Sequence, residues 1–303
     1  MNTQDKYHGC LVGLALGDAL GAPFEGGIIE RFLWKFFSTT KTGEIRYTDD
    51  TQMTIDIARS LIAYQGINQN ELAEQFSSSY QWSRGYGPSA AKLLKAIKKG
   101  QNWQILNTKY FKNGSYGNGA AMRIAPVALF YPNNPRLMQY AVEKTSVITH
   151  AHPDAITGAK IIAQAIVVML KDKQETLVQQ LIETNNNDYK SKLLQVKKWL
   201  ENTDKPTTKE VAKKLGNGIE AINSTVTAVY LALRFLNQDF NELIKFVQNL
   251  KGDTDTIATM SSAIWGAKNG LKAIKDPQLE TLESKQKIIK LADALYYLSL
   301  KSV

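Results

Sequence analysis

The chain has 303 residues, 44% hydrophobic and 21% charged, and its 37 lysines and arginines exceed its 28 aspartates and glutamates to give a formal net charge of +9. This composition is typical of one large globular domain or two modest ones, and it excludes a disordered tail or a collagen-like fibre. A single cysteine, Cys10, cannot form an internal disulfide, so we expect a reducing compartment, the cytoplasm.

Two apolar stretches bear on targeting. The stretch from Gly9 to Pro23 resembles a signal sequence, but Asp18 interrupts it and no cationic leader precedes it. The run Ile161–Leu170 is about half of the roughly 20 residues that a membrane-spanning helix needs. We therefore expect no membrane span.

The positive charge is scattered. Lysines occur from Lys92 to Lys301, mostly beside carboxylates or amides, and no basic cluster is interleaved with aromatic residues. This pattern favours a solvated surface over a nucleic-acid-binding face, so we expect no nucleic-acid partner. We also expect a monomer.

Apolar residues spaced by three and four predict helices along most of the chain. In chain order the predicted helices are Gln52–Tyr64, Asn70–Trp82, Ser89–Lys99, Leu137–Ile148, Thr157–Leu170, Ser224–Leu236, Asn241–Leu250 and Gln286–Ser299. No alternating apolar and polar run is followed by a hairpin dipeptide, so no sheet core is expected. The sequence predicts an all-α, single-domain bundle over residues 1–303, with a polar surface excursion at about 183–208.

Glu25 ends an apolar segment and is surrounded by flexible residues, Gly21-Ala22-Pro23-Phe24-Glu25-Gly26-Gly27. An isolated glutamate is usually a surface residue. On a mobile loop near a metal it can instead act as a catalytic acid or base.

Two acidic clusters lie at predicted helix N-termini: Thr48-Asp49-Asp50-Thr51, before the helix near Gln52, and Asp253-Thr254-Asp255-Thr256, before Ile257–Lys268. Aspartate and threonine cap helices by accepting bonds from free N–H groups, but one such residue suffices. Paired carboxylates at each end are also the oxygen donors that Mg²⁺ and Mn²⁺ prefer. Capping and metal binding therefore stand as alternatives for both clusters.

A glycine-rich loop, Gly114-Ser115-Tyr116-Gly117-Asn118-Gly119, precedes the helix-like run Ala120–Phe130. Its glycines would let backbone N–H groups turn inward and cradle phosphate oxygens, although the same pattern also makes a simple tight connection. The loop does not match the Walker or dinucleotide fingerprints.

Two histidines follow, in Thr149-His150-Ala151-His152-Pro153. Spaced by two residues, they do not share a helix face, and with one cysteine in the chain a zinc site is not expected. Either ring is expected to donate a hydrogen bond to a ligand phosphate or to be satisfied in the interior.

Taken in order, these motifs resemble the ADP-ribosylglycohydrolase family. The resemblance runs from Gly13-Leu14-Ala15-Leu16-Gly17-Asp18 through the Thr48 cluster, Gly117-Asn118-Gly119-Ala120-Ala121-Met122-Arg123 and Thr149-His150 to Gly252-Asp253-Thr254-Asp255-Thr256. It covers about residues 8–270, most of the chain.

The resemblance implies an all-α orthogonal helical bundle and a metal-dependent hydrolase that releases ADP-ribose from an acceptor, namely a modified arginine or serine side chain or an ADP-ribose polymer. It implies two divalent cations, Mg²⁺ or Mn²⁺, and the catalytic residues Glu25 and Asp50. The implied metal ligands are Thr48, Asp49, Asp50, Asp253, Asp255 and Thr256, and the implied ADP-ribose contacts are Gly114, Ser115, Tyr116, Gly117, Asn118, His150 and Tyr110. Tyr116 and Tyr110 are expected to enclose the adenine.

Two departures from the family pattern concern the acceptor. Lys251 stands where the family often has glycine, and Trp265 stands where a small residue is common. The sequence leaves open whether Trp265 reshapes the acceptor pocket. The alternatives are a catalytically inactive relative and a two-metal phosphohydrolase that cleaves the diphosphate.

Overall fold

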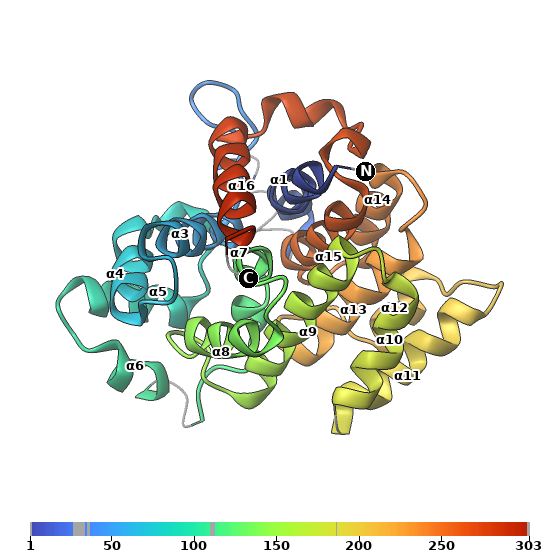
Figure 1. Cartoon of the computed structure of the whole chain (residues 1–303), viewed down its shortest axis with the longest axis horizontal. Helices are drawn as coiled ribbons and strands as arrows, with labels where there is room; N and C mark the ends of the chain where they lie inside the picture. The colour runs from blue at the N-terminus through green and yellow to red at the C-terminus, as the bar shows by residue number, and fades with distance from the viewer. Residues whose placement is uncertain (1, 27–33, 35–36, 110–112, 186, 302–303) are drawn as a thin grey trace.

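The structure is a computed structural model that describes residues 2–26, 34, 37–109, 113–185 and 187–301. Within these ranges it contains helices and isolated β-bridges but no strand. Figure 1 shows one compact body in which α3 to α6 lie on one side and α10 to α12 on the other. The all-α prediction is confirmed.

All eight helices predicted from periodicity are present, with ends shifted by a few residues. The α-helices are α1 Thr3–Gly21, α3 Asp49–Tyr64, α4 Gln69–Ser79, α5 Pro88–Lys98, α6 Trp103–Lys109, α7 Ala125–Phe130, α8 Pro135–Ser146, α9 Pro153–Leu170, α10 Gln174–Thr184, α11 Asn187–Glu201, α12 Thr208–Lys214, α13 Ala221–Arg234, α14 Phe240–Leu250, α15 Thr254–Asn269 and α16 Lys285–Ser299. Short 3₁₀ turns are η1 Ala22–Phe24, η2 Trp82–Arg84, η3 Asn118–Ala120, η4 Leu271–Ala273 and η5 Pro277–Thr281.

One predicted helical run is interrupted. The run Ala120–Phe130 is not continuous, because η3 ends at Ala120 and α7 begins only at Ala125. Pro126 lies in the first turn of α7, where a missing N–H costs nothing, so it marks a helix start rather than a helix interior.

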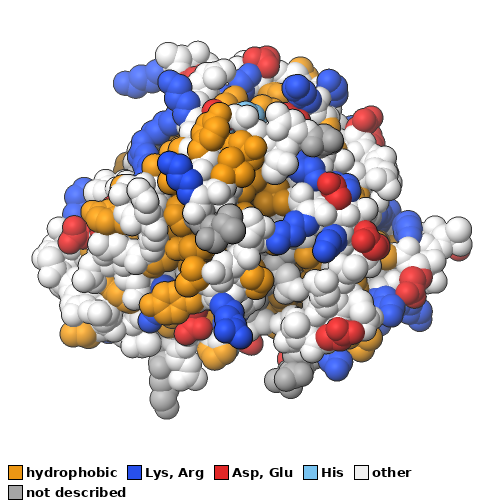
Figure 2. Space-filling model, in the orientation of Figure 1, with side chains coloured by type: hydrophobic (Ala, Val, Ile, Leu, Met, Phe, Trp, Pro, Cys, Tyr) orange, Lys and Arg blue, Asp and Glu red, His pale blue; other side chains and the backbone are white. Residues whose placement is uncertain are grey.

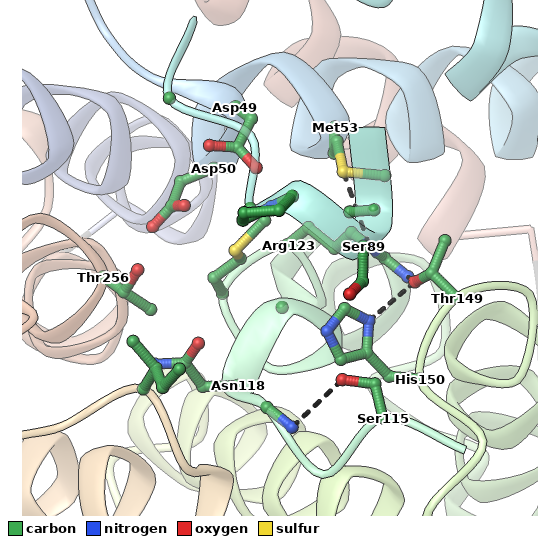
Figure 3. Close-up of a pocket in the computed structure, with 18 of the residues that line it drawn as sticks. Asp49, Asp50, Met53, Ser89, Ser115, Asn118, Arg123, Thr149, His150 and Thr256 are labelled. Carbon is green, nitrogen blue, oxygen red and sulfur yellow. Dashed lines mark hydrogen bonds between the residues drawn. The ribbon is translucent and has the colours of Figure 1, made fainter. Parts of the chain in front are cut away.

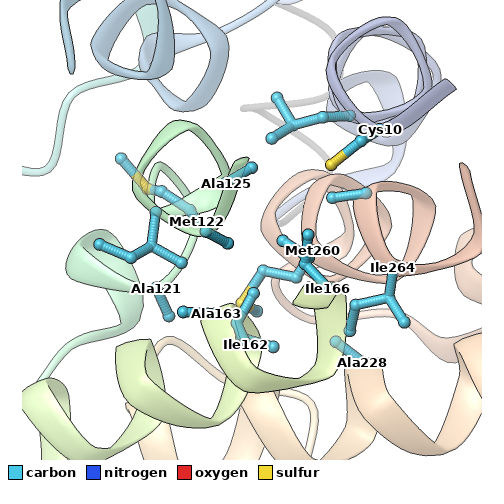
Figure 4. Packing of buried hydrophobic residues seen from close by; sticks show 14 of the residues in the cluster. Cys10, Ala121, Met122, Ala125, Ile162, Ala163, Ile166, Ala228, Met260 and Ile264 are labelled. Carbon is cyan, nitrogen blue, oxygen red and sulfur yellow. The ribbon is translucent and has the colours of Figure 1, made fainter. Parts of the chain in front are cut away.

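The core is built by α1, α9, α13 and α15, which pack against one another at the centre. Figure 4 shows Cys10, Ile166, Ala228, Met260 and Ile264 meeting from these four helices. Cys10 is fully buried here, as a small apolar residue would be.

The apolar helix α9 has 18 residues, long and apolar enough by length and composition to cross a membrane. Most of it is buried against α7, α8, α13 and α15. Its central position accounts for its composition, since a helix that is apolar on most faces suits the middle of a large core.

The closest helix pair is α1 with α15, and small residues permit the approach. A Cβ on Gly9 would lie 2.5 Å from the carbonyl oxygen of Gly266. At the other end of the pair, Thr254 Oγ1 donates to the carbonyl oxygen of Gly21 at 3.0 Å. The C-terminal end of α1 is thereby fixed beside the N-terminal end of α15.

The polar segment 183–208 contains helix α11. Tyr189, Leu193 and Val196 on this helix are buried, and α11 packs against α10 and α13. The described part of this segment therefore contains an amphipathic helix followed by a short connection.

Candidate active site

The two acidic clusters meet at the C-terminal end of α1. Asp18, fully buried on α1, accepts hydrogen bonds from the Thr48 N–H (3.0 Å), the Thr51 N–H (3.0 Å) and Thr51 Oγ1 (2.6 Å). These bonds attach the N-terminus of α3 to α1, and Gly21 attaches the N-terminus of α15 to the same end. Two helix N-termini separated by about 200 residues in sequence therefore face one pocket.

Helix capping accounts for only some of the residues in the two acidic clusters. Thr48 caps α3, because its Oγ1 accepts from the Asp50 N–H at 3.2 Å. Asp253 occupies the N-cap position of α15 but makes no capping bond, and it instead accepts from the Asn118 side-chain amide. Asp50 Oδ2 is buried and has no hydrogen-bond partner among the described residues. The remaining carboxylates are thus available for another role.

The carboxyl groups destabilise one another as anions. Burial, followed by repulsion from neighbouring carboxylates, raises the pKa values of Asp49, Asp50 and Asp255 well above their usual range. Burial also raises the pKa of Asp253. Such a crowded set of oxygen donors fits hard divalent cations, whose charge would remove the repulsion.

Glu25 follows η1, the short turn that continues α1. Its carboxylate comes close to those of Asp253 and Asp255, with one oxygen of each lying within 4.8 Å of the others. The contact between α1 and α15 brings this glutamate to the acidic cluster.

One side of the pocket is acidic, and the opposite side carries uncharged polar side chains. In Figure 3, Asp49, Asp50 and Thr256 lie on one side, and Ser89, Thr149 and His150 lie across from them. Arg123 is the one lysine or arginine among the described lining residues. Further walls are apolar and come from Met53, Leu93, Leu106 and Met122.

The glycine-rich loop forms one edge of the pocket. Ser115, Gly117 and Asn118 line the cavity. The N–H groups of Gly117 and Asn118 are already used, because they donate to Ser115 Oγ (3.3 Å) and to the Ile219 carbonyl (2.9 Å). These two N–H groups therefore do not form the inward-facing cradle that the sequence suggested.

Three of the residues that the resemblance implied as ADP-ribose contacts are not among the described lining residues: Gly114, Tyr116 and Tyr110. Gly114 is outside the lining and has a φ of +81°, and a Cβ there would lie 2.7 Å from Ala151. The Tyr116 side chain is 46% exposed and is not among the lining residues, and its ring packs edge-on against His152 at 6.2 Å. Tyr110 lies outside the described residues.

His150 lines the pocket. Its Nδ1 lies 2.7 Å from Thr149 Oγ1, whereas His152 caps α9 by accepting from the Asp154 N–H at 3.1 Å. Burial lowers the pKa of His150 to about 3, so the ring is neutral. The two histidines therefore have separate roles.

Sequence reasoning did not assign several pocket residues. Gly85, Gly87, Pro88 and Ser89 line one wall, and Ile219 lies near the glycine-rich loop. The Gly-Tyr-Gly-Pro sequence at 85–88 was the available signal, since such a segment marks a turn that can approach a ligand closely.

The two departures from the family pattern lie away from the pocket. Trp265 is buried in the core, where its Nε1 donates to the Phe235 carbonyl at 3.0 Å and its ring packs against Phe240. Trp265 is not among the described lining residues, because its side chain points to the end of α13 and to α14. Lys251 is exposed and is not among the described lining residues.

Comparison with solved structures identifies the fold. A solved structure titled "ADP-ribosylglycohydrolase-related protein complex" has the same fold, with a TM-score of 0.73 and 23% identity over 98% of this chain and 99% of that one. The fold is therefore that of the helical ADP-ribosylglycohydrolases.

The amino-acid sequence itself shows the family to which the chain belongs. It matches the family model described as ADP-ribosylglycohydrolase over residues 1–302, and the chain belongs to this family of glycosidic-bond hydrolases. Proteins named ADP-ribosylhydrolase ARH3 are similar: that of Xenopus tropicalis is 33% identical, covering 89% of this chain and 88% of its own length, and that of Gallus gallus is 31% identical, covering 97% and 93%. The chain is thus an enzyme of the ADP-ribosylhydrolase class.

Proposed function

We propose that this enzyme cleaves the bond between the anomeric carbon of ADP-ribose and a modified protein side chain or an ADP-ribose polymer, and that the reaction requires divalent cations. The observation that carries the proposal is the position of Glu25, whose carboxylate lies beside those of Asp253 and Asp255 at the pocket. This position supports a role for Glu25 in proton transfer beside a set of oxygen donors.

Two cations, Mg²⁺ or Mn²⁺, would be held by Thr48, Asp49, Asp50, Asp253, Asp255 and Thr256. The unpartnered oxygen of Asp50 and the mutual repulsion of the carboxylates support this assignment. When bound, such ions orient the ribose hydroxyls and a water molecule and lower the pKa of that water.

The residues of the chain supply the remaining chemistry. Breaking the glycosidic bond builds positive charge on the ribose ring, which the surrounding carboxylates stabilise. Glu25 would protonate the leaving oxygen or nitrogen, or accept a proton from the attacking water. Ser115 and His150 provide polar groups for the diphosphate and ribose, and the apolar wall of Leu93 and Leu106 offers a surface for the purine.

The test uses two defined substrates, an arginine-modified and a serine-modified protein, each with Mg²⁺ and with a chelator. We expect Mg²⁺-dependent release of intact ADP-ribose from at least one of them. Release of AMP would instead indicate cleavage of the diphosphate, and equal rates with chelator would remove the metal from the reaction.

A further inference from the structure

The His150 ring has close neighbours at two of its edges. Its Nδ1 faces Thr149 Oγ1 at 2.7 Å. Its other edge lies against the glycine-rich loop, where a Cβ on Gly119 would stand 2.5 Å from the ring carbon Cε1 and 2.7 Å from Nε2. Nε2 has no hydrogen-bond partner among the described residues, and the ring lines the pocket.

Thr149 is held in turn by Arg123. Nη2 of Arg123 donates to Thr149 Oγ1 at 2.7 Å. The arginine is 1% exposed, its guanidinium lies 4.8 Å from the centre of the Phe76 ring, and its Nη1 lies 3.5 Å from Met53 Sδ. These contacts hold the guanidinium in place.

These contacts determine the direction of each hydrogen bond. A guanidinium can only donate, so Thr149 Oγ1 accepts from Arg123. The hydroxyl proton then needs an acceptor, and the one other partner of Oγ1 among the described residues is His150 Nδ1. A proton on Nδ1 would leave a buried hydroxyl proton unpaired, which is unfavourable.

The neutral imidazole carries one proton, and because Nδ1 accepts from the Thr149 hydroxyl, that proton lies on Nε2. We propose that Arg123 and Thr149 are positioning residues that fix His150 as the Nε2–H tautomer, so that the ring donates a hydrogen bond to a diphosphate or ribose oxygen of ADP-ribose. The identity of that ligand rests on the proposed function. The opposite tautomer would direct a lone pair at an anionic oxygen and would repel it.

The first measurement is ¹⁵N NMR of the histidine rings in the unliganded protein, with the His150 signal assigned by its loss in His150→Gln. The chain has three histidines, so the assignment is direct. We expect a protonated Nε2 and an unprotonated Nδ1. A protonated Nδ1 would overturn the proposal.

The second measurement compares Thr149→Val, which keeps the shape of the side chain and removes the hydroxyl, with Thr149→Ser, which keeps the hydroxyl. In Thr149→Val we expect the Nδ1–H tautomer to appear and ADP-ribose to bind about tenfold more weakly, the effect of one lost hydrogen bond. Thr149→Ser should retain the wild-type tautomer and bind within about twofold. Thermal unfolding of both variants verifies that they are folded.

The outcomes separate the two proposals. An unchanged tautomer in Thr149→Val, or a changed tautomer with unchanged ADP-ribose affinity, contradicts the role given to Arg123 and Thr149. If the wild-type protein has the Nε2–H tautomer but binds no ADP-ribose, the ring assignment stands and the proposed function fails.

Discussion

Glu25 is the residue on which the proposed chemistry depends most directly. We expect Glu25→Gln to lower kcat by about 10²-fold or more, the usual contribution of a general acid or base, because the amide keeps the shape of the side chain but cannot exchange a proton. The dissociation constant of ADP-ribose should change little. The measurements are steady-state release of ADP-ribose and calorimetric binding.

Glu201→Gln is a matched control for this variant, since Glu201 is exposed at the end of α11, away from the pocket. A Glu25→Gln enzyme with wild-type kcat would remove Glu25 from the mechanism.

Asp56 gives a prediction that does not depend on the reaction. Its carboxylate is fully buried on α3 and accepts from Gln75 Nε2 at 3.1 Å, and burial raises its pKa to about 6. The folded state therefore holds this proton more tightly than the unfolded state, so the free energy of unfolding falls as the pH rises from about 4 to about 6. A shift of this size corresponds to roughly 3 kcal/mol.

Asp56→Asn should remove this dependence. We expect the variant to be more stable than the wild type at pH 7.5 by up to about 3 kcal/mol, and the two to converge near pH 4. Urea unfolding at both pH values measures this difference. A variant less stable than the wild type at pH 7.5 would show that the ionised carboxylate contributes more through its hydrogen bonds than its burial costs.

At the scale of elements, the junction between α14 and α15 carries a strained residue. Lys251 has φ +62° and ψ −178°, a region that is almost restricted to glycine. Relief of this strain, offset by the greater freedom of glycine in the unfolded chain, should make Lys251→Gly more stable by about 1 kcal/mol.

Lys251→Ala separates backbone strain from charge, because alanine removes the ammonium group but is strained by the same φ. Thermal unfolding should show an increase in Tm for glycine and not for alanine. Equal increases for both would assign the effect to charge.

The helices themselves were the most predictable part of the fold. Periodicity and caps are local signals, so the sequence indicates α3, α9 and α16 without knowledge of their neighbours. The ends moved where a cap or proline decides the boundary, as at Thr48 and Pro126.

The site was predictable only in part. The two acidic clusters can be recognised from composition alone. Their proximity in space depends on Asp18 and on the packing of α1 with α15, which involve distant parts of the chain. The chain of hydrogen bonds from Arg123 to His150 has no local signal, and the position of Trp265 stayed open because the sequence does not show which face of α15 meets α13 and α14.

At the scale of the whole molecule, charge is spread over the surface. On the face shown in Figure 2, lysines and arginines are interspersed with polar and acidic side chains. The net charge of +9 thus forms no single basic patch on this face, in keeping with a role in solubility.

Cations bound between α3 and α15 should stabilise the fold as a whole. Mg²⁺ at about 100 times its dissociation constant would add about 2.7 kcal/mol, or roughly 4 °C in Tm for a chain of this size. In Asp255→Asn we expect this increase to be lost, and the metal-free variant to be more stable than the metal-free wild type because one repelling carboxylate is gone.

Asp204→Asn, at an exposed position outside the pocket, is the control and should keep the response to Mg²⁺. A full increase in Tm with Mg²⁺ in Asp255→Asn would place the metals elsewhere.

The pairing of α1 with α15 has a consequence for biosynthesis. About 230 residues separate the two helices, so α1 leaves the ribosome long before its main partner is made. During that interval the face of α1 that packs on α15 remains uncovered, and a nascent chain that ends before Asp253 contains neither the second acidic cluster nor the surface that receives Gly9. The enzyme therefore acquires its pocket late in synthesis, and the growing chain exposes a hydrophobic helix to chaperones until then.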